Sequence, residues 1–313
     1  MNDLVIIAGP TAVGKSSVAV RLAKLINGSV ISADSMQVYR GMDIGTAKLT
    51  SEEMEGIPHY LIDVLDPSCD FNIVTFRQMA KSAISDIRKA GRIPMIVGGT
   101  GFYIQSVVYD IDFPEGDELT EYRKELLGLI EEKGAGYVHD MLRAIDPEAA
   151  DKIHPNDHKR MIRALEYNRQ TGGLISDHNA RSFERTSPYN FSYFVLTDDR
   201  QKIYERINRR VDKMIEEGLV DEVRGLLARG LTRENVSMQG LGYKEIIDCL
   251  EGRCTLDEAI YTIKRDSRHF AKRQLTWYRR ERDVCYIRAG NTDLMLEEMM
   301  RELAGKGIIN GKP

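Results

Sequence analysis

One motif constrains this chain more than any other feature, because it fixes both a local fold and a type of ligand. Residues 9–16 read GPTAVGKS and match the pattern G-x-x-x-x-G-K-[ST]. The apolar run LVIIA precedes the motif, and apolar residues with a helical period follow it in residues 17–26. In such a strand–loop–helix unit, backbone N–H groups surround phosphate oxygens at a helix N-terminus. The predicted phosphate-binding residues are Gly9, Pro10, Thr11, Ala12, Val13, Gly14, Lys15 and Ser16.

The last two residues of the motif have separate expected roles. Lys15 provides a positive charge for the terminal phosphate, and the Ser16 hydroxyl is expected to ligate Mg²⁺. A hydrolysing NTPase of the switch or motor type also needs an acidic residue after a later apolar strand. The strand predicted at residues 93–97 instead runs into Gly98-Gly99-Thr100-Gly101. We therefore expect a bound di- or triphosphate to take part in group transfer and not in regulated hydrolysis.

The first 110 residues alternate between short apolar runs and helical periods. The runs at residues 30–33 and 93–97 have the length of buried parallel strands, and residues 76–90 form an amphipathic pattern that stops at Gly91. This alternation predicts an α/β fold, a doubly wound parallel sheet of the P-loop nucleotide-kinase type.

Helical periodicity dominates residues 113–197, until the strand-like run FSYFVL returns the chain to the sheet. We predict a mainly helical insertion domain there, within a core made of residues 1–112 and 198–313. Residues 199–229 are expected to form two helices separated at Gly218, and residues 256–281 one long helix.

Composition excludes several classes of protein. The 313 residues are 42% hydrophobic and 29% charged, which is typical of a globular chain and unlike a disordered one. No apolar run approaches the roughly 20 residues that span a bilayer. We expect no signal sequence, because the first residues are not basic and the apolar run at residues 4–8 is short. Four cysteines make no disulfide framework or zinc-binding spacing. We expect a cytoplasmic monomer with free thiols and no membrane contact.

Asp34 follows the run at residues 30–33, at the strand end where ligands of open α/β sheets bind. A carboxylate beside the phosphate loop can accept a proton from an attacking nucleophile. It can equally cap a turn or a helix, and position alone favours neither role. Gln37, three residues later, has the donor and acceptor that suit the edge of a base.

Seven segments occur in an order that resembles one family. Their sequences are GPTAVGKS (9–16), DSMQVYRGMDIGTAK (34–48), PHYLID (58–63), VGGTGFY (97–103), HPNDHKRMIRALEYNRQTG (154–172), QGLGYKE (239–245) and KRQLTWY (272–278). Together they are similar to the tRNA dimethylallyltransferases, over about residues 4–290. Small departures are Ser16, Tyr60 and Lys244, where threonine, histidine and arginine are common, and none removes a charge or a catalytic group.

The resemblance implies a reaction. Dimethylallyl diphosphate would be the donor, Mg²⁺ the cofactor, and N6 of adenine 37 the acceptor in tRNAs that read UNN codons. Asp34 would be the general base, and Thr100 would position the amine or a diphosphate oxygen. Arg210 matches a family position near the diphosphate, although it could also be a solvated arginine beside Arg206 and Arg209.

Local charge favours an RNA partner although the chain as a whole carries −4. Between Lys264 and Arg282, eight basic residues face two acidic ones, with Phe270 and Trp277 interleaved. We expect the charges to bind the tRNA anticodon stem-loop and these two rings to lie in the core. The resemblance and the basic groups predict tRNA contacts from Asp34, Ser35, Met36, Gln37, Thr100, Arg123, Lys159, Arg160, Met161, Ile162, Arg163, Gln239, Gly240, Gly242, Tyr243, Lys244, Lys272, Arg273, Gln274 and Trp277.

Two other functions compete with this hypothesis. A small-molecule or nucleotide kinase would share the phosphate loop, use ATP, and employ Asp34 to deprotonate a hydroxyl. An RNA-binding regulator would bind tRNA without forming a product. Whether ATP occupies the loop is left open by the sequence.

Overall fold

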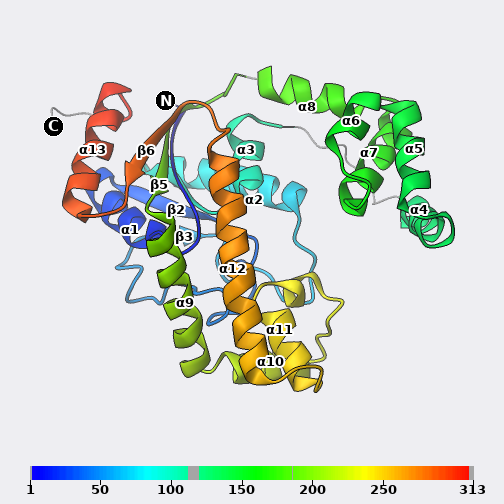
Figure 1. Ribbon diagram of the computed structural model, residues 1–313. Coiled ribbons are helices and arrows are strands. Elements are labelled where there is room, and N and C mark those ends of the chain that lie inside the picture. Colours follow the sequence, from blue (N-terminus) through cyan, green and yellow to red (C-terminus); the bar gives the residue numbers. More distant parts are fainter. Residues whose placement is uncertain (1, 112–119, 185, 310–313) are drawn as a thin grey trace. The chain divides into compact units, whose positions relative to one another are not determined.

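The computed structural model describes residues 2–111, 120–184 and 186–309, and it divides the chain into two compact units (Figure 1). The first unit comprises residues 1–108 and 188–313, and the second comprises residues 109–187. The insertion was expected at residues 113–197, whereas the second unit ends at residue 187. The expected range therefore wrongly includes β5, Asn190–Thr197, which lies in the sheet of the first unit. Each unit is described by itself below.

The first unit contains the predicted α/β fold, and its described residues form one sheet of six strands that are all parallel. Their order across the sheet is β3-β2-β4-β1-β5-β6. The strands are β1 Asp3–Ala8, β2 Gly28–Ala33, β3 His59–Tyr60, β4 Ile93–Gly98, β5 Asn190–Thr197 and β6 Val284–Arg288. The apolar runs correctly predicted β1, β2, β4 and β5, whereas β3 and β6 were not predicted.

Helices cover the sheet and extend beyond it. Apolar residues of α1 and α13 pack with alternate residues of the strands, such as Val5 and Ile7 of β1, while α2 and α3 contact β4. The helices of this unit are α1 Lys15–Ile26, α2 Ile73–Lys89, α3 Gly101–Val108, α9 Arg200–Glu216, α10 Leu219–Ala228, α11 Tyr243–Leu250, α12 Leu256–Tyr278 and α13 Thr292–Gly305, with a short 3₁₀ helix at Val236–Gln239.

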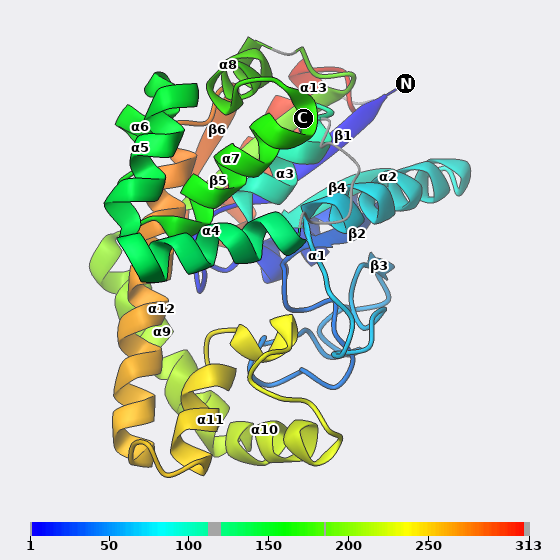
Figure 2. The same cartoon turned by 90° about the vertical axis from the view of Figure 1, so that its right-hand side faces the viewer.

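Two predictions about the later helices are confirmed. Gly218, at φ +100°, separates α9 from α10, and the long helix predicted at residues 256–281 is α12. Helices α9 and α12 run side by side, with α10 and α11 beyond the end of the sheet (Figure 2). Within residues 2–111, 120–184 and 186–309, no helix combines the length and the apolar character that a membrane crossing requires.

The second unit is helical, as the sequence predicts. A small apolar core that includes Leu126, Leu142, Met161 and Leu165 holds its helices together. The helices are α4 Thr120–Lys133, α5 Ala135–Ile145, α6 Pro147–Lys152, α7 His158–Thr171 and α8 Ile175–Glu184.

The parallel register decides where the functional loops lie. Ala8 pairs with Gly98, and Gly98 pairs with Ala33, so β1, β4 and β2 end at the same level. All strands point the same way, and the loops that follow these three ends therefore meet at one edge of the sheet. The phosphate loop, the Thr100 turn and the Asp34 turn begin at these ends.

Packing of α1 against the sheet should make a large contribution to stability. Leu22 is fully buried on the inner face of α1, whereas Leu25 on the same helix is 57% exposed. We expect Leu22→Ala to lower the free energy of unfolding by about 2–5 kcal/mol and Leu25→Ala to change it by less than about 1 kcal/mol. Urea unfolding of the two variants measures the difference, and equal effects would contradict the packing described here.

Candidate active site

The backbone of the phosphate loop uses glycine at two positions where φ is positive. Gly9 has φ +145°, and a Cβ there would lie 2.5 Å from the Leu196 carbonyl oxygen. Gly14, at φ +98°, leads into α1. The Lys15 ammonium donates hydrogen bonds to the carbonyl oxygens of Gly9 at 3.0 Å and Pro10 at 2.8 Å. The loop therefore curls around its own lysine, as a phosphate-binding loop does.

A second cation lies against this loop. Arg210 on α9 donates to the Thr11 hydroxyl at 3.2 Å and to the Thr46 carbonyl oxygen at 3.2 Å. Burial lowers the pKa of Arg210, and the negative charge of Asp34 opposes that shift. Its neighbour Arg206 instead pairs with Asp198. Arg210 therefore does not occupy the solvated position that the sequence left open as an alternative.

Lys15, Arg210 and Asp34 influence one another electrostatically. The pKa of Lys15 is lowered to about 8, chiefly by burial; Asp34 opposes this shift and Arg210 adds to it. Two positive groups therefore share this corner with one carboxylate. An anion bound here would relieve the cost of holding the cations close together away from bulk water.

Asp34 caps a turn with one oxygen. Its Oδ1 accepts hydrogen bonds from the backbone N–H groups of Met36 at 2.9 Å and Gln37 at 3.4 Å. Within the described part of the chain, Oδ2 has no hydrogen-bond partner. The capping role and the catalytic role are thus compatible, because the turn orients the carboxylate and leaves Oδ2 available as a base.

Thr100 lies next to Asp34 because β2 and β4 are neighbours. The Thr100 N–H donates to the carbonyl oxygen of Ala33, the residue before Asp34, at 3.3 Å. A Cβ at Gly98 would lie 2.3 Å from that same oxygen. The glycine turn therefore allows the two strand ends to approach closely, and it brings the backbones of Asp34 and Thr100, two of the residues that the resemblance assigned to catalysis, near each other.

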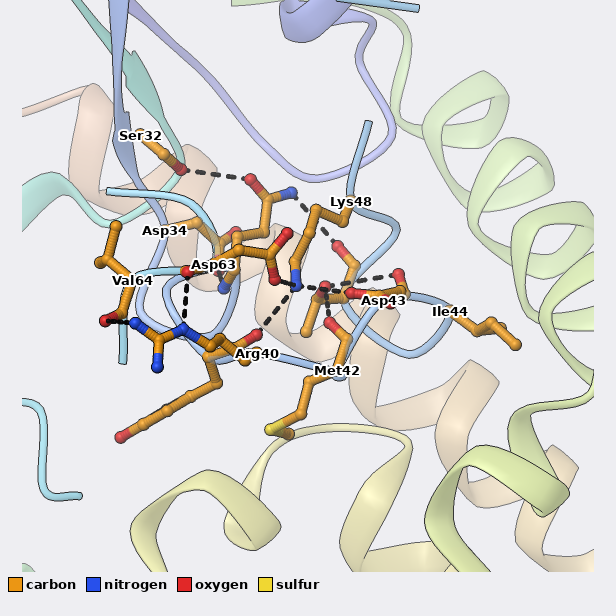
Figure 3. A network of polar contacts seen from close by, with 12 residues as sticks. Ser32, Asp34, Arg40, Met42, Asp43, Ile44, Lys48, Asp63 and Val64 are labelled. Atoms are coloured by element: carbon orange, nitrogen blue, oxygen red, sulfur yellow. Dashed lines mark hydrogen bonds and ion pairs between the residues drawn. The ribbon is translucent and has the colours of Figure 1, made fainter. Parts of the chain in front are cut away.

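A polar network fixes the segment that follows Asp34 (Figure 3). The buried Lys48 ammonium lies between the carboxylates of Asp43 and Asp63 and also donates to the Tyr39 carbonyl oxygen. Arg40 donates to the carbonyl oxygens of Asp63 and Val64. These contacts tie the segment to the chain around β3 and hold its backbone in place.

The Gln37 side chain is held by this segment. Its amide oxygen accepts from Ser32 at 3.1 Å, and its amide nitrogen faces the carbonyl oxygens of Thr46 at 3.3 Å and Ala47 at 3.4 Å. The Thr46 carbonyl oxygen therefore serves both Gln37 and Arg210. Reading of a base by Gln37 stays a prediction.

Glu222 on α10 is a site residue that the sequence reasoning missed. Its carboxylate accepts from the N–H groups of Asp43, Ile44 and Gly45 and from the Tyr243 hydroxyl, at 2.7–3.1 Å. Tyr243 is 1% exposed, and a Cβ at Gly45 would lie 2.5 Å from its ring. Glu222 thus holds the loop that carries Thr46. Only this tertiary contact distinguishes it from a solvated helix glutamate.

The other predicted tRNA contacts in the first unit differ in accessibility. Lys272, Arg273 and Gln239 are exposed, and Ser35, Met36, Lys244 and Trp277 are part-buried. Gly242 begins α11 at φ +96°, and a Cβ at Gly240 would meet the Met36 side chain. Gln274 is buried and bonded to two backbone groups. Trp277 and Phe270 are part-buried, so the prediction of full core positions for them is wrong.

In the second unit, the predicted contacts fall into two groups. Lys159, Arg160 and Arg163 are exposed on α7, whereas Met161 and Ile162 belong to the apolar core. Arg123 on α4 forms a two-bonded ion pair with the buried Glu166. The three exposed basic residues present one face of α7 that suits phosphate groups.

The donor set limits what kind of metal site this chain offers. Among the described residues, no group of three His, Cys, Asp or Glu side chains is arranged to hold a metal ion. Ser16, the second residue of α1, is part-buried and supplies one hydroxyl beside the phosphate loop. Mg²⁺ is commonly held by one or two protein groups together with substrate phosphates. The residues present fit a cation that arrives with a diphosphate.

Comparisons with known proteins agree over almost the whole chain. The sequence profile of the family described as IPP transferase matches residues 37–281. The tRNA dimethylallyltransferase of Lachnoclostridium phytofermentans is 56% identical over 312 residues, which cover 99% of this chain and 100% of that protein. The tRNA dimethylallyltransferase of Carboxydothermus hydrogenoformans is 52% identical over 293 residues, 94% of each chain.

Solved structures of similar proteins include bacterial and eukaryotic enzymes. The full-length tRNA isopentenylpyrophosphate transferase from Bacillus halodurans is 47% identical, with a TM-score of 0.74 over 98% of this chain and 97% of that one. A eukaryotic dimethylallyltransferase, described as acting on tRNA, is 30% identical, with a TM-score of 0.81 over 98% of this chain and 80% of that one.

The lowered pKa of Lys15 predicts how anion binding depends on pH. Below about pH 8 the free protein carries the Lys15 charge, and above it the charge is progressively lost. We expect the affinity for inorganic diphosphate to fall as pH rises above 8, by at most about tenfold per pH unit. Calorimetric titrations at several pH values measure this dependence.

A matched variant separates the titration of Lys15 from the titration of diphosphate. Lys15→Arg keeps its charge at all accessible pH values, so its affinity should show only the titration of diphosphate itself. Identical pH profiles for the two proteins would contradict a lowered pKa at Lys15.

Proposed function

The chain belongs to the IPP transferase family, as one of its tRNA dimethylallyltransferases, and from that premise we propose its detailed reaction. The enzyme transfers the dimethylallyl group of dimethylallyl diphosphate to N6 of adenine 37 in tRNAs that read codons beginning with U. The products are N6-(dimethylallyl)adenosine in the tRNA and free diphosphate. The observation that carries this assignment is the convergence of Lys15 and Arg210 beside Asp34 at one edge of the sheet.

Departure of the diphosphate is the step that the cations assist. The bond between the allylic carbon and the diphosphate oxygen breaks, and its electron pair stays with the oxygen. Lys15, Arg210 and the N–H groups of the phosphate loop stabilise the charge that develops there. Mg²⁺, when bound with Ser16 as its protein ligand, would neutralise further negative charge on the diphosphate.

Attack by adenine N6 requires removal of a proton. The N6 lone pair is delocalised into the ring, so the amine is a weak nucleophile until it begins to lose a proton. As the new bond from N6 to the allylic carbon forms, Asp34 Oδ2 accepts one N6 proton. The cap formed by Oδ1 fixes the carboxylate. Thr100 orients the amine in this proposal, which is supported by the hydrogen bond from its N–H group to the carbonyl oxygen of Ala33, the residue before Asp34.

Recognition of the tRNA uses both units. The exposed Lys272 and Arg273 on α12, and the basic face of α7, provide contacts for phosphate groups. The target adenine lies in a single-stranded loop, where moving it out of its stack costs least.

A substrate experiment separates this function from the kinase alternative. With tRNA and dimethylallyl diphosphate but no ATP, we expect diphosphate to be released in equal amount to the prenyl group incorporated into RNA. A kinase would need ATP and would leave the tRNA unprenylated under these conditions. Measurement of both products in one reaction distinguishes the two, and absence of incorporation with a good substrate tRNA contradicts the proposal.

Replacement of Asp34 tests its role as the base. Asp34→Asn keeps an oxygen for the Met36 N–H group but loses basicity, so turnover should fall by about 10²–10⁴ with little change in donor binding. Steady-state kinetics with both substrates measure the effect. As a control, Asp86→Asn removes an exposed carboxylate on α2 and should leave the rates unchanged. Full activity of Asp34→Asn would exclude Asp34 from the mechanism.

A further inference from the structure

Gln274 connects α12 to two loops of the active site. Its amide oxygen accepts a hydrogen bond from the Thr11 N–H group of the phosphate loop at 2.8 Å. Its amide nitrogen donates to the Gly99 carbonyl oxygen, in the turn that follows β4, at 2.9 Å. The residue is only 6% exposed. The Gln274 amide therefore links Thr11 of the phosphate loop to Gly99 of the turn after β4.

The local backbone is adapted to this amide. A Cβ at Gly99 would lie 2.3 Å from the Gln274 amide nitrogen, so a larger residue there would displace it. Gly99 does not have a positive φ. The reason for a glycine here is therefore the room that Gln274 occupies and not a left-handed backbone.

The same part of the phosphate loop is held from α9. Arg210 donates to the Thr11 hydroxyl, and Ala12 packs against the cluster of Ile203, Ile207 and Ala271 between α9 and α12. Thr11 is thus fixed by its side chain to α9 and by its N–H group to α12. Because the Thr11 N–H group already donates to Gln274, the N–H groups of later loop residues are left for a phosphate.

Gln274 and its sequence neighbours face in different directions. Lys272 and Arg273 are exposed, whereas Gln274 points inward and uses both ends of its amide within the protein. Gln274 is only 6% exposed, so RNA could reach its amide only if these contacts broke, and breaking them would leave buried polar groups unpaired.

We propose that Gln274 is a positioning residue for the donor diphosphate and not a tRNA contact. It sets the backbone of the phosphate loop relative to the glycine turn that carries Thr100, so that the diphosphate and the catalytic groups are correctly placed. This inference rests on the proposed function, in which the loop holds the diphosphate.

Two variants break the same bridge in different ways. Gln274→Met keeps the length of the side chain and removes both hydrogen bonds. Gly99→Ala leaves Gln274 in the chain but places a Cβ 2.3 Å from its amide nitrogen, which must then move. We expect each to raise the KM for dimethylallyl diphosphate and the Kd for inorganic diphosphate by about tenfold. The Kd for tRNA should stay within about twofold.

The double variant provides an additional test. Because both substitutions remove one bridge, the double variant should resemble either single variant, and the effects should not multiply. Thr276→Val, on the exposed side of α12, is the matched control and should change none of the constants. Lys272→Met should give the opposite pattern, with weaker tRNA binding and unchanged diphosphate binding.

The outcomes separate this inference from the proposed function. Variants that weaken tRNA binding and leave diphosphate binding unchanged would make Gln274 a tRNA contact and overturn the inference alone, as would variants with no effect. Failure of the wild-type enzyme to bind diphosphate would overturn the proposed function and this inference with it. Thermal unfolding checks that each variant is folded. If Gln274→Met does not fold, Gly99→Ala alone provides the test.

Discussion

The imbalance of charge at the carboxyl edge of the sheet is the constraint on which the site depends. Lys15 and Arg210 lie within electrostatic reach of a single carboxylate, Asp34, and burial lowers the pKa of both cations. Such a corner is stabilised when a multiply charged anion enters it. A diphosphate leaving group needs this environment most when its bond breaks, because that is when its negative charge increases.

The fold creates this corner and the surrounding loops keep it in place. The parallel strands β1, β2 and β4 end at one level. Gly98 lets the ends of β4 and β2 approach closely, and Gly9 leaves room for the Leu196 carbonyl oxygen of β5. Two residues on helices later in the chain then hold these loops in place. Glu222 holds the loop whose Thr46 carbonyl oxygen binds Arg210, and Gln274 joins the phosphate loop to the turn before Thr100.

The sequence predicted the parts of this site that depend on local chemistry. The phosphate loop, four strands and the break at Gly218 each carry a pattern of glycine and apolar residues that is readable without a structure. Strand β3 has only two residues and β6 is largely part-exposed, so neither leaves a clear apolar run. The apolar face of α13 was not recognised.

Side-chain direction was the part that the sequence could not supply. Glu222 has the appearance of a solvated helix residue, and Gln274 stands within a basic run that suggested RNA. Their roles come from packing between elements far apart in the chain, which periodicity does not encode. Tyr243 shows the same limit, because its burial against Gly45 depends on where α11 meets the loop after Asp34.

The measurement that tests the central claim most directly is mass spectrometry of the anticodon fragment after reaction of purified enzyme with unmodified tRNA and dimethylallyl diphosphate. The account predicts one added C5H8 group, located on the base of adenine 37, and its loss from the product when that adenine is replaced by another base. An unmodified fragment, or the group on another nucleotide, would contradict the account.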